Sequence, residues 1–317
     1  MGVTVMKLLG HPALTRTVIT ATAQRLRVLA FHDIIDPAGF RAQLAHLIDR
    51  YHIVTGQQVA HASLGGPRLP ARAVWITFDD GHPAVFRVGA PILAEFGITA
   101  TAYVCPGLVE TQQPFWWETV RKAARHGLTV PVDSETIPAP KLEAALKRSP
   151  DPVRRQVVRE LGEKLSTVAP GHVNSQATLD DLRSWIRRGH EIGNHTWDHP
   201  CLDRCSDDEQ RRQVTRAHEW LESHLDIPVS SFAYPNGNWG AAAEDQLRRL
   251  GYRTGVGFDH HLHRPSRDPL RISRLRLDSD APAARARAVV SGTHPALLSA
   301  RTVLRSDTND DPRRLPR

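Results

Sequence analysis

The chain has 317 residues, with 41 Lys and Arg against 34 Asp and Glu, and a formal net charge of +7. This length suits one large α/β domain or two small ones. The basic residues are scattered and form no run that alternates with aromatic residues, which argues against a nucleic-acid partner. No apolar stretch is long enough to predict a transmembrane helix.

Residues 1–25 are expected to be an N-terminal leader that precedes the folded domain. His11, Pro12 and Arg16 interrupt the apolar segment that an export signal requires. We therefore expect a cytoplasmic protein.

Strand-like and helix-like segments alternate along the chain after the leader. Residues 26–33 predict a strand, residues 37–51 have the apolar spacing of a helix, and residues 73–78 predict a buried strand rich in β-branched and aromatic side chains. The same alternation predicts further strands at 98–105, 190–196, 229–235, 252–258 and 271–277, and further helices at 85–96, 178–189, 206–225, 241–251 and 281–292. This order is typical of an α/β fold, here a distorted (β/α) barrel of about seven parallel strands over residues 26–295.

Residues 107–175 interrupt the alternation and predict a helical insertion. The insertion contains Trp116 and Trp117, which either line a sugar-binding groove or form the insertion's own core. Residues 296–317 are poor in apolar side chains and are expected to be a disordered tail.

Polar side chains follow several of the predicted strands, and in a parallel barrel these strand ends meet at one edge. They include His32, Asp79, Asp80, His195, His199 and residues 234–237. Two adjacent carboxylates are unfavourable unless a cation or hydrogen bonds compensate them. One carboxylate and two imidazoles suit a divalent metal, with zinc as the first choice, so Asp80, His195 and His199 are the candidate ligands.

The three cysteines, Cys105, Cys201 and Cys205, suggest a reducing compartment because they provide no framework of pairs. Cys201 and Cys205 closely follow the two histidines, so a role as ligands stays open beside the default of core packing.

Three segments carry a family resemblance: TFDDG at 77–81, HTWDH at 195–199 and FAYPNG at 232–237. They resemble the motifs of the polysaccharide deacetylase family, also called the NodB-homology domain or carbohydrate esterase family 4. The resemblance covers about residues 26 to 280. It implies a distorted (β/α) barrel that uses one metal ion to remove an acetyl group from an N-acetylated sugar.

The resemblance also implies residue roles. Asp80, His195 and His199 match the metal ligands, and Asp79 matches the catalytic base. This division is chemically reasonable, because a metal lowers the pKa of a bound water while a separate carboxylate accepts the proton.

The third motif implies that the backbone N–H of Asn236 stabilises the developing oxyanion. Many family members have Arg where this chain has Ala233, and that Arg orients the base. Arg274 is the candidate replacement, and the alternative is that Arg274 is a surface charge.

The family's general acid is a His in a Leu-x-x-His setting at a strand end, usually near the C-terminus. His294 is late in the chain but follows a predicted helix, whereas Leu29 and His32 fit the pattern at the end of the first predicted strand. We therefore predict His32 as the acid, with the last motif moved to the front of the chain.

The predicted function is a metal-dependent hydrolase of carbon–nitrogen bonds that deacetylates an N-acetylated amino sugar, oligosaccharide or glycoconjugate. The alternatives are a non-sugar amide hydrolase or deformylase on the same scaffold, and a non-catalytic carbohydrate-binding relative.

Overall fold

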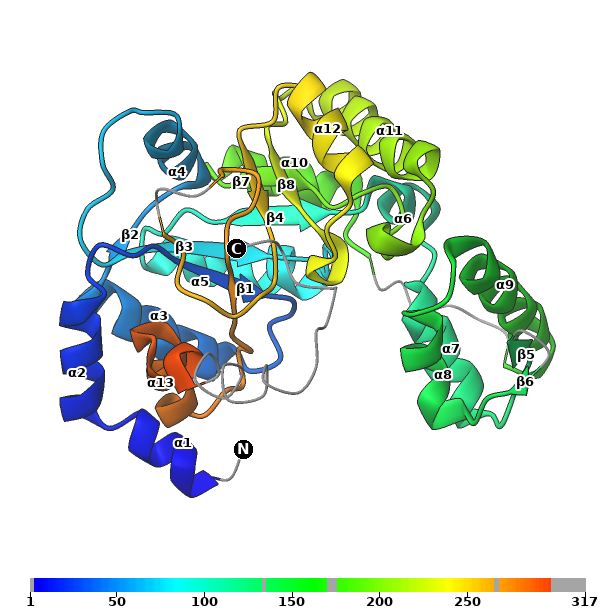
Figure 1. Cartoon of the computed structure of the whole chain (residues 1–317), viewed down its shortest axis with the longest axis horizontal. Helices are drawn as coiled ribbons and strands as arrows, with labels where there is room; N and C mark the ends of the chain where they lie inside the picture. Colours follow the sequence, from blue (N-terminus) through cyan, green and yellow to red (C-terminus); the bar gives the residue numbers. More distant parts are fainter. Residues whose placement is uncertain (1–2, 133–134, 170–175, 265–267, 298–317) are drawn as a thin grey trace.

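The computed structural model describes residues 3–132, 135–169, 176–264 and 268–297. A curled sheet runs through the centre of the molecule, and helices cover its outer face (Figure 1). The strands of this sheet are β1 (Arg27–Phe31), β2 (His52–Ile53), β3 (Ala73–Phe78), β4 (Thr101–Val104), β7 (Glu191–Asn194), β8 (Ser231–Ala233), β9 (Thr254–Val256) and β10 (Leu275–Arg276).

The strand order is β10-β1-β3-β4-β7-β8-β9, with β2 added beside β3, and all pairs are parallel. Residues 272–276 connect the two edges of the sheet. Ile272 bridges to Val256 of β9, and Leu275 pairs with Leu29 of β1. The prediction of a distorted barrel with about seven parallel strands is therefore confirmed.

The body of the molecule also contains helices that pack around the sheet and short helical turns near its edge. These are α3 (Pro37–Arg50), α4 (Gly56–Ser63), η1 (Val85–Gly89), α5 (Ala90–Glu95), α6 (Pro106–Thr111), α10 (Leu179–Arg187), η2 (Leu202–Arg204), α11 (Asp207–Leu225), η3 (Pro235–Gly237), α12 (Ala241–Arg249) and α13 (Ala283–Ser291). The sequence predicted one helix over 85–96, but its first turn is a π-helix.

Side chains on the strands alternate between the barrel interior and the outer face. Val28 of β1, Trp75 of β3, Tyr103 of β4 and Val256 of β9 belong to one buried cluster. Because these strands are spread across the sheet, this cluster is the interior of the barrel. Trp75 of β3 therefore points into the barrel. Because side chains alternate along a strand, those of Thr77 and Asp79 point inward as well.

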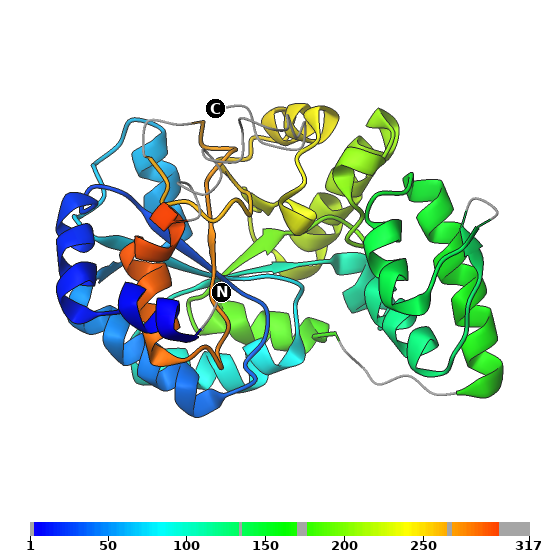
Figure 2. The same cartoon turned by 60° about the horizontal axis from the view of Figure 1, so that its bottom comes forward.

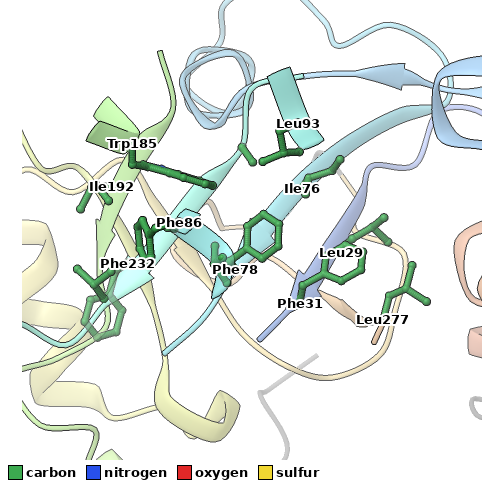
Figure 3. Close-up of a cluster of buried hydrophobic side chains, with 14 of the residues drawn as sticks. Leu29, Phe31, Ile76, Phe78, Phe86, Leu93, Trp185, Ile192, Phe232 and Leu277 are labelled. Atoms are coloured by element: carbon green, nitrogen blue, oxygen red, sulfur yellow. The ribbon is translucent and has the colours of Figure 1, made fainter. Parts of the chain in front are cut away.

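The alternate positions form the outer core, against which the helices pack (Figure 3). Phe31 and Phe78 lie on neighbouring strands with ring centroids 5.5 Å apart. Trp185 of α10 covers Phe78 at 6.0 Å and Phe86 of η1 at 5.3 Å. Burial of these rings is the main stabilising contribution of this layer.

The N-terminal residues form α1 (Val3–Leu9) and α2 (Pro12–Ala21), and both pack against α13. The Thr293 hydroxyl donates a hydrogen bond to the Leu9 carbonyl at 2.8 Å, which joins the two ends of the described chain. Within the described ranges, no helix is both long and apolar enough to cross a membrane.

The predicted insertion contains a lobe that projects from one side of the sheet (Figures 1 and 2). Its elements are α7 (Trp116–Arg125), β5 (Pro131–Val132), β6 (Glu135–Thr136), α8 (Ala139–Leu146) and α9 (Asp151–Val168). The lobe has its own apolar cluster, which includes Val120, Leu142 and Leu161. The predicted disordered tail lies, from residue 298 onward, outside the described residues.

Candidate active site

Asp79 lies at the end of β3 and points into the barrel, as the alternation of this strand requires. The residue is 3% exposed, and both of its carboxylate oxygens accept hydrogen bonds from Arg274, at 2.7 and 2.6 Å. Arg274 is itself 0% exposed. Its Nε donates to the Gly257 carbonyl at 2.8 Å, and Nη1 donates to the Thr77 hydroxyl at 3.2 Å. Arg274 is therefore not the surface charge of the alternative hypothesis.

The position of Arg274 follows from the closure of the barrel. It lies between Ile272, which bridges to β9, and Leu275, which pairs with β1, so its side chain enters the barrel where the two edges meet. Burial by itself would raise the pKa of the Asp79 carboxyl, but the charges of Arg274 and His195 outweigh burial and lower that pKa. Asp79 is thus an ionised carboxylate held by two parallel hydrogen bonds.

Asp80, His195 and His199 converge beside Asp79. The Nε2 atoms of His195 and His199 lie 3.4 and 3.3 Å from Asp80 Oδ1. One ligand atom from each residue lies within 4.8 Å of the others. In the part of the chain that the structure describes, this is the single group of three His, Cys, Asp or Glu residues with this geometry, and neither Cys201 nor Cys205 belongs to it.

These three residues fit a divalent metal ion. Asp80 Oδ1 is buried, and apart from the two imidazole nitrogens at 3.3 and 3.4 Å it has no polar partner among the described residues, as a position next to a cation would require. His195 Nδ1 lies 2.8 Å from the Ala233 carbonyl. Since a carbonyl only accepts, Nδ1 carries a proton, which leaves Nε2, on the side of Asp80, as the nitrogen that a metal would bind. Two imidazoles and one carboxylate are a typical catalytic zinc set with an open position.

The loops at this edge hold an unusual backbone geometry. Asp80, Thr196, His199 and Asn236 have φ values of 71°, 69°, 59° and 55°, in the left-handed region that residues other than glycine rarely adopt. Asn194 Oδ1 accepts a hydrogen bond from the Thr196 N–H at 2.8 Å and so supports the turn at Thr196, whose β-branched side chain disfavours this conformation. Such conformations concentrate at functional sites, where the surrounding structure enforces them.

The predicted site residues line one cavity of about 320 Å³. It contains Asp79, Asp80, His195 and His199 together with His32, Asn236 and Arg274. The structure therefore brings together every site residue that the sequence singled out in the main hypothesis. His294 does not line it but lines a different cavity beside His260 and Arg285, and Arg276 borders both cavities.

The insertion contributes to the same cavity in a way that the sequence did not reveal. Trp117 of α7 lines the cavity and its ring lies edge-on to His199 at 4.6 Å, whereas Trp116 is 5% exposed and belongs to the insertion's core. Trp116 is therefore part of the insertion's core, whereas Trp117 packs against that core and also lines the cavity. Arg121, Glu143 and Lys147 also reach the cavity from the lobe, and no local sequence signal marks them.

A sequence profile of the family described as Polysaccharide deacetylase matches residues 66–162 and 159–255, together more than half of the chain. The chain belongs to the polysaccharide deacetylase family. Members of this family are hydrolases of carbon–nitrogen bonds, which agrees with the predicted enzyme class. Both matched segments contain strand ends of the candidate site.

Among curated proteins, the chain is 24% identical over 221 residues to the poly-beta-1,6-N-acetyl-D-glucosamine N-deacetylase of Escherichia coli strain K12. The match covers 68% of this chain but 29% of that protein, so the chain spans less than a third of its relative.

Solved structures share the fold. A Streptococcus pyogenes deacetylase, PplD, crystallised with acetate, superposes with a TM-score of 0.59 and 19% identity, covering 82% of this chain and 96% of that one. IcaB from Ammonifex degensii gives 0.56 and 19%, covering 84% and 97%. The deacetylase domain of BpsB from Bordetella bronchiseptica gives 0.54 and 15%, covering 81% and 97%.

Proposed function

We propose that this protein is a metal-dependent deacetylase that hydrolyses the N-acetyl group of an amino sugar within an oligosaccharide, polysaccharide or glycoconjugate. The observation that carries the proposal is the arrangement of two carboxylates with different surroundings in one cavity. Asp80 faces two imidazole nitrogens, whereas Asp79 faces Arg274. The family membership and the names of the relatives support the reaction class.

Asp80, His195 and His199 would hold the metal, and zinc is the ion we propose. A divalent ion in this position would polarise the acetyl carbonyl and lower the pKa of a bound water. Asp79 is the base that accepts the proton of the attacking water. Arg274 keeps Asp79 ionised and fixes both of its oxygens, so that the carboxylate is ready to accept a proton without rearranging.

His32 and Asn236 complete the site. His32 follows β1 at the cavity wall, its Nδ1 is buried, and this atom has no hydrogen-bond partner within the described residues. We propose that His32 donates a proton to the departing amine. The backbone N–H of Asn236 would donate a hydrogen bond to the oxyanion, as the YPNG turn at the cavity wall allows.

The cavity suits a sugar substrate. Trp117 offers a flat apolar ring beside His199, against which the apolar face of a pyranose ring can stack. The Escherichia coli relative acts on a polymer of N-acetylglucosamine, which makes a glucosamine-based glycan the first substrate to test. A cytoplasmic location stays a prediction from the N-terminal sequence.

The test is acetate release from a panel of N-acetylated oligosaccharides, measured with metal-depleted protein before and after zinc is restored. We expect release that depends on zinc. Formate release from N-formyl substrates with no acetate release would support a deformylase instead. Sugar binding without any hydrolysis by the zinc-loaded protein would support the non-catalytic alternative.

A further inference from the structure

A second, larger cavity of about 1320 Å³ lies between the insertion and the body of the molecule. Its insertion side is formed by one face of α7 and one face of α9. Thr119 and Lys122 follow helical spacing on α7, and His126 caps the end of that helix. Arg155, Arg159 and Gly162 follow helical spacing on α9. The body contributes His82, Pro83, Leu108 and Asp198.

The two ends of this cavity differ in charge. At the inner end, carboxylates neutralise the arginines: Arg154 pairs with Asp151, and Arg155 pairs with Asp151, Asp198 and Glu209. The other end presents Arg125 and Arg159, together with Lys122, whose Nζ donates a hydrogen bond to the Ala169 carbonyl at 3.0 Å. Arg125 and Arg159 are exposed, and among the described residues neither side chain takes part in an ion pair or hydrogen bond. The guanidinium groups of Arg125 and Arg159 are therefore available to an anion.

Gly162 keeps this end of the cavity open. It lies inside the 18-residue helix α9, where glycine costs about 1 kcal/mol of helix stability relative to alanine. A Cβ placed on Gly162 would meet no atom within 4 Å, so packing does not require glycine there. The missing side chain instead leaves free space on the face of α9 that lines the cavity.

We propose that this cavity, which we name the α7–α9 groove, binds an anionic group carried by the glycan substrate. This proposal rests on the proposed function, since it assigns the substrate class as an acidic glycan. The group that would bind in the groove is an anion with several oxygen atoms, either a phosphate or a carboxylate on a sugar. Guanidinium groups bind both through paired hydrogen bonds.

The groove is next to the catalytic cavity, so one ligand can occupy both. Asp198 lines the groove and directly precedes His199, while Trp116 and Trp117 are adjacent residues that line the groove and the catalytic cavity respectively. A glycan whose N-acetyl group enters the catalytic cavity can thus place a neighbouring acidic unit between α7 and α9.

The test uses length-matched N-acetylglucosamine oligosaccharides that are neutral, phosphorylated or carboxylated. Binding is measured by calorimetry on the metal-depleted 317-residue chain, and kcat/KM is measured on the same chain loaded with zinc. The variants are Arg125→Gln/Arg159→Gln and Gly162→Leu. Arg249→Gln is the matched control, because Arg249 is exposed on α12 and has no ion pair in the described part of the chain.

We expect the wild type to bind at least one acidic series about tenfold more tightly than the neutral one at low salt, with the preference reduced by 0.5 M salt. The double variant should lose this preference while its kcat/KM on neutral substrate stays unchanged. Gly162→Leu should weaken acidic binding without lowering the melting temperature. Arg249→Gln should behave as wild type. The phosphate and carboxylate series identify which anion is preferred.

Equal binding of acidic and neutral glycans by the wild type would overturn the groove proposal, even if the enzyme deacetylates them. An acidic preference that the double variant retains would overturn it as well. Charge-dependent binding with no hydrolysis by zinc-loaded protein would support the groove and overturn the proposed function, so the two failures are distinguishable.

Discussion

At the scale of single residues, the buried pair of Asp79 and Arg274 explains why two carboxylates follow one strand. Side chains along β3 alternate between the two faces of the sheet, and this alternation directs Asp79 into the barrel. The left-handed backbone conformation of Asp80 turns the Asp80 carboxylate toward His195 and His199. The inward direction of Asp79 could be predicted from this alternation. Arg274 could only be a candidate, because its position depends on how the two sheet edges meet.

Arg274→Met should destabilise the protein by about 3–5 kcal/mol, because it leaves a carboxylate that is 3% exposed without its partner. Asp79→Asn should also be destabilising, since Arg274 keeps a buried, uncompensated charge. The double variant should lose less stability than the sum of the two single variants. Urea unfolding of metal-depleted protein measures all three. Strict additivity would show that the two side chains do not stabilise each other.

His32→Ala should lower turnover of an N-acetyl sugar by about 100-fold or more and keep the metal, because proton donation to the departing nitrogen is lost. An aryl acetate should be affected less, since its leaving group needs no proton. His294→Ala is the comparison variant and should change little, because His294 lies in a different cavity. If the His294→Ala variant is impaired and the His32→Ala variant is nearly normal, the general acid is His294, at the usual C-terminal position.

At the scale of secondary-structure elements, the insertion is anchored to the loop that carries the predicted metal ligands. Arg155 of α9 donates hydrogen bonds to both Asp198 oxygens, at 2.7 and 3.0 Å, and Trp116 of α7 donates to the His199 carbonyl at 3.3 Å. These contacts could not be predicted, because they link segments whose docking is set by tertiary packing rather than by local pattern.

Arg155→Met should weaken metal binding by about tenfold, the lower end of what loss of a supporting contact costs a metal site. The reason is that the 195–199 loop loses its anchor while all three ligands remain. Competition with a chromophoric chelator measures the affinity. Arg159→Met is the control, because Arg159 lies one turn away on α9 and has no ion pair within the described ranges. Equal metal affinities for both variants would contradict the anchoring role.

A buried histidine directly precedes β7 and should make stability depend on pH. Burial lowers the pKa of His190 from 6.5 to about 4, and its Nδ1 accepts a hydrogen bond from the Ala100 N–H at 3.3 Å. The unfolded chain therefore takes up this proton at a higher pH than the folded chain does. The contribution of His190 is complete above pH 6.5 and is lost as the pH falls toward 4.

His190→Gln should accordingly be less stable than the wild type at pH 7, and the difference should shrink at pH 5. Chemical unfolding of both proteins at the two pH values measures this. A difference that is the same at both pH values would show that His190 does not titrate between the folded and unfolded states in this range.

At the scale of the whole molecule, the sequence was sufficient for the strand–helix alternation and for the residues at the strand ends. The helices expected over 178–189 and 281–292 are present as α10, which begins with a capping box of Thr178 and Asp181, and α13, which ends at Gly292. The approach of residues 272–276 to both β9 and β1 was not predictable, nor was the contribution of Glu143 and Lys147 to the catalytic cavity. These features depend on contacts between distant segments.

The central claim is that Asp80, His195 and His199 hold a metal that hydrolysis requires, while Asp79 works beside it without being a ligand. The most direct measurement is zinc per chain and acetate release, determined in parallel for the wild type, His199→Ala and Asp79→Asn. We expect His199→Ala to lose both zinc and activity, because two remaining ligands leave a weak site. Asp79→Asn should keep zinc and lose at least about 100-fold in turnover. Full zinc and activity in His199→Ala, or near-normal turnover in Asp79→Asn, would contradict the claim.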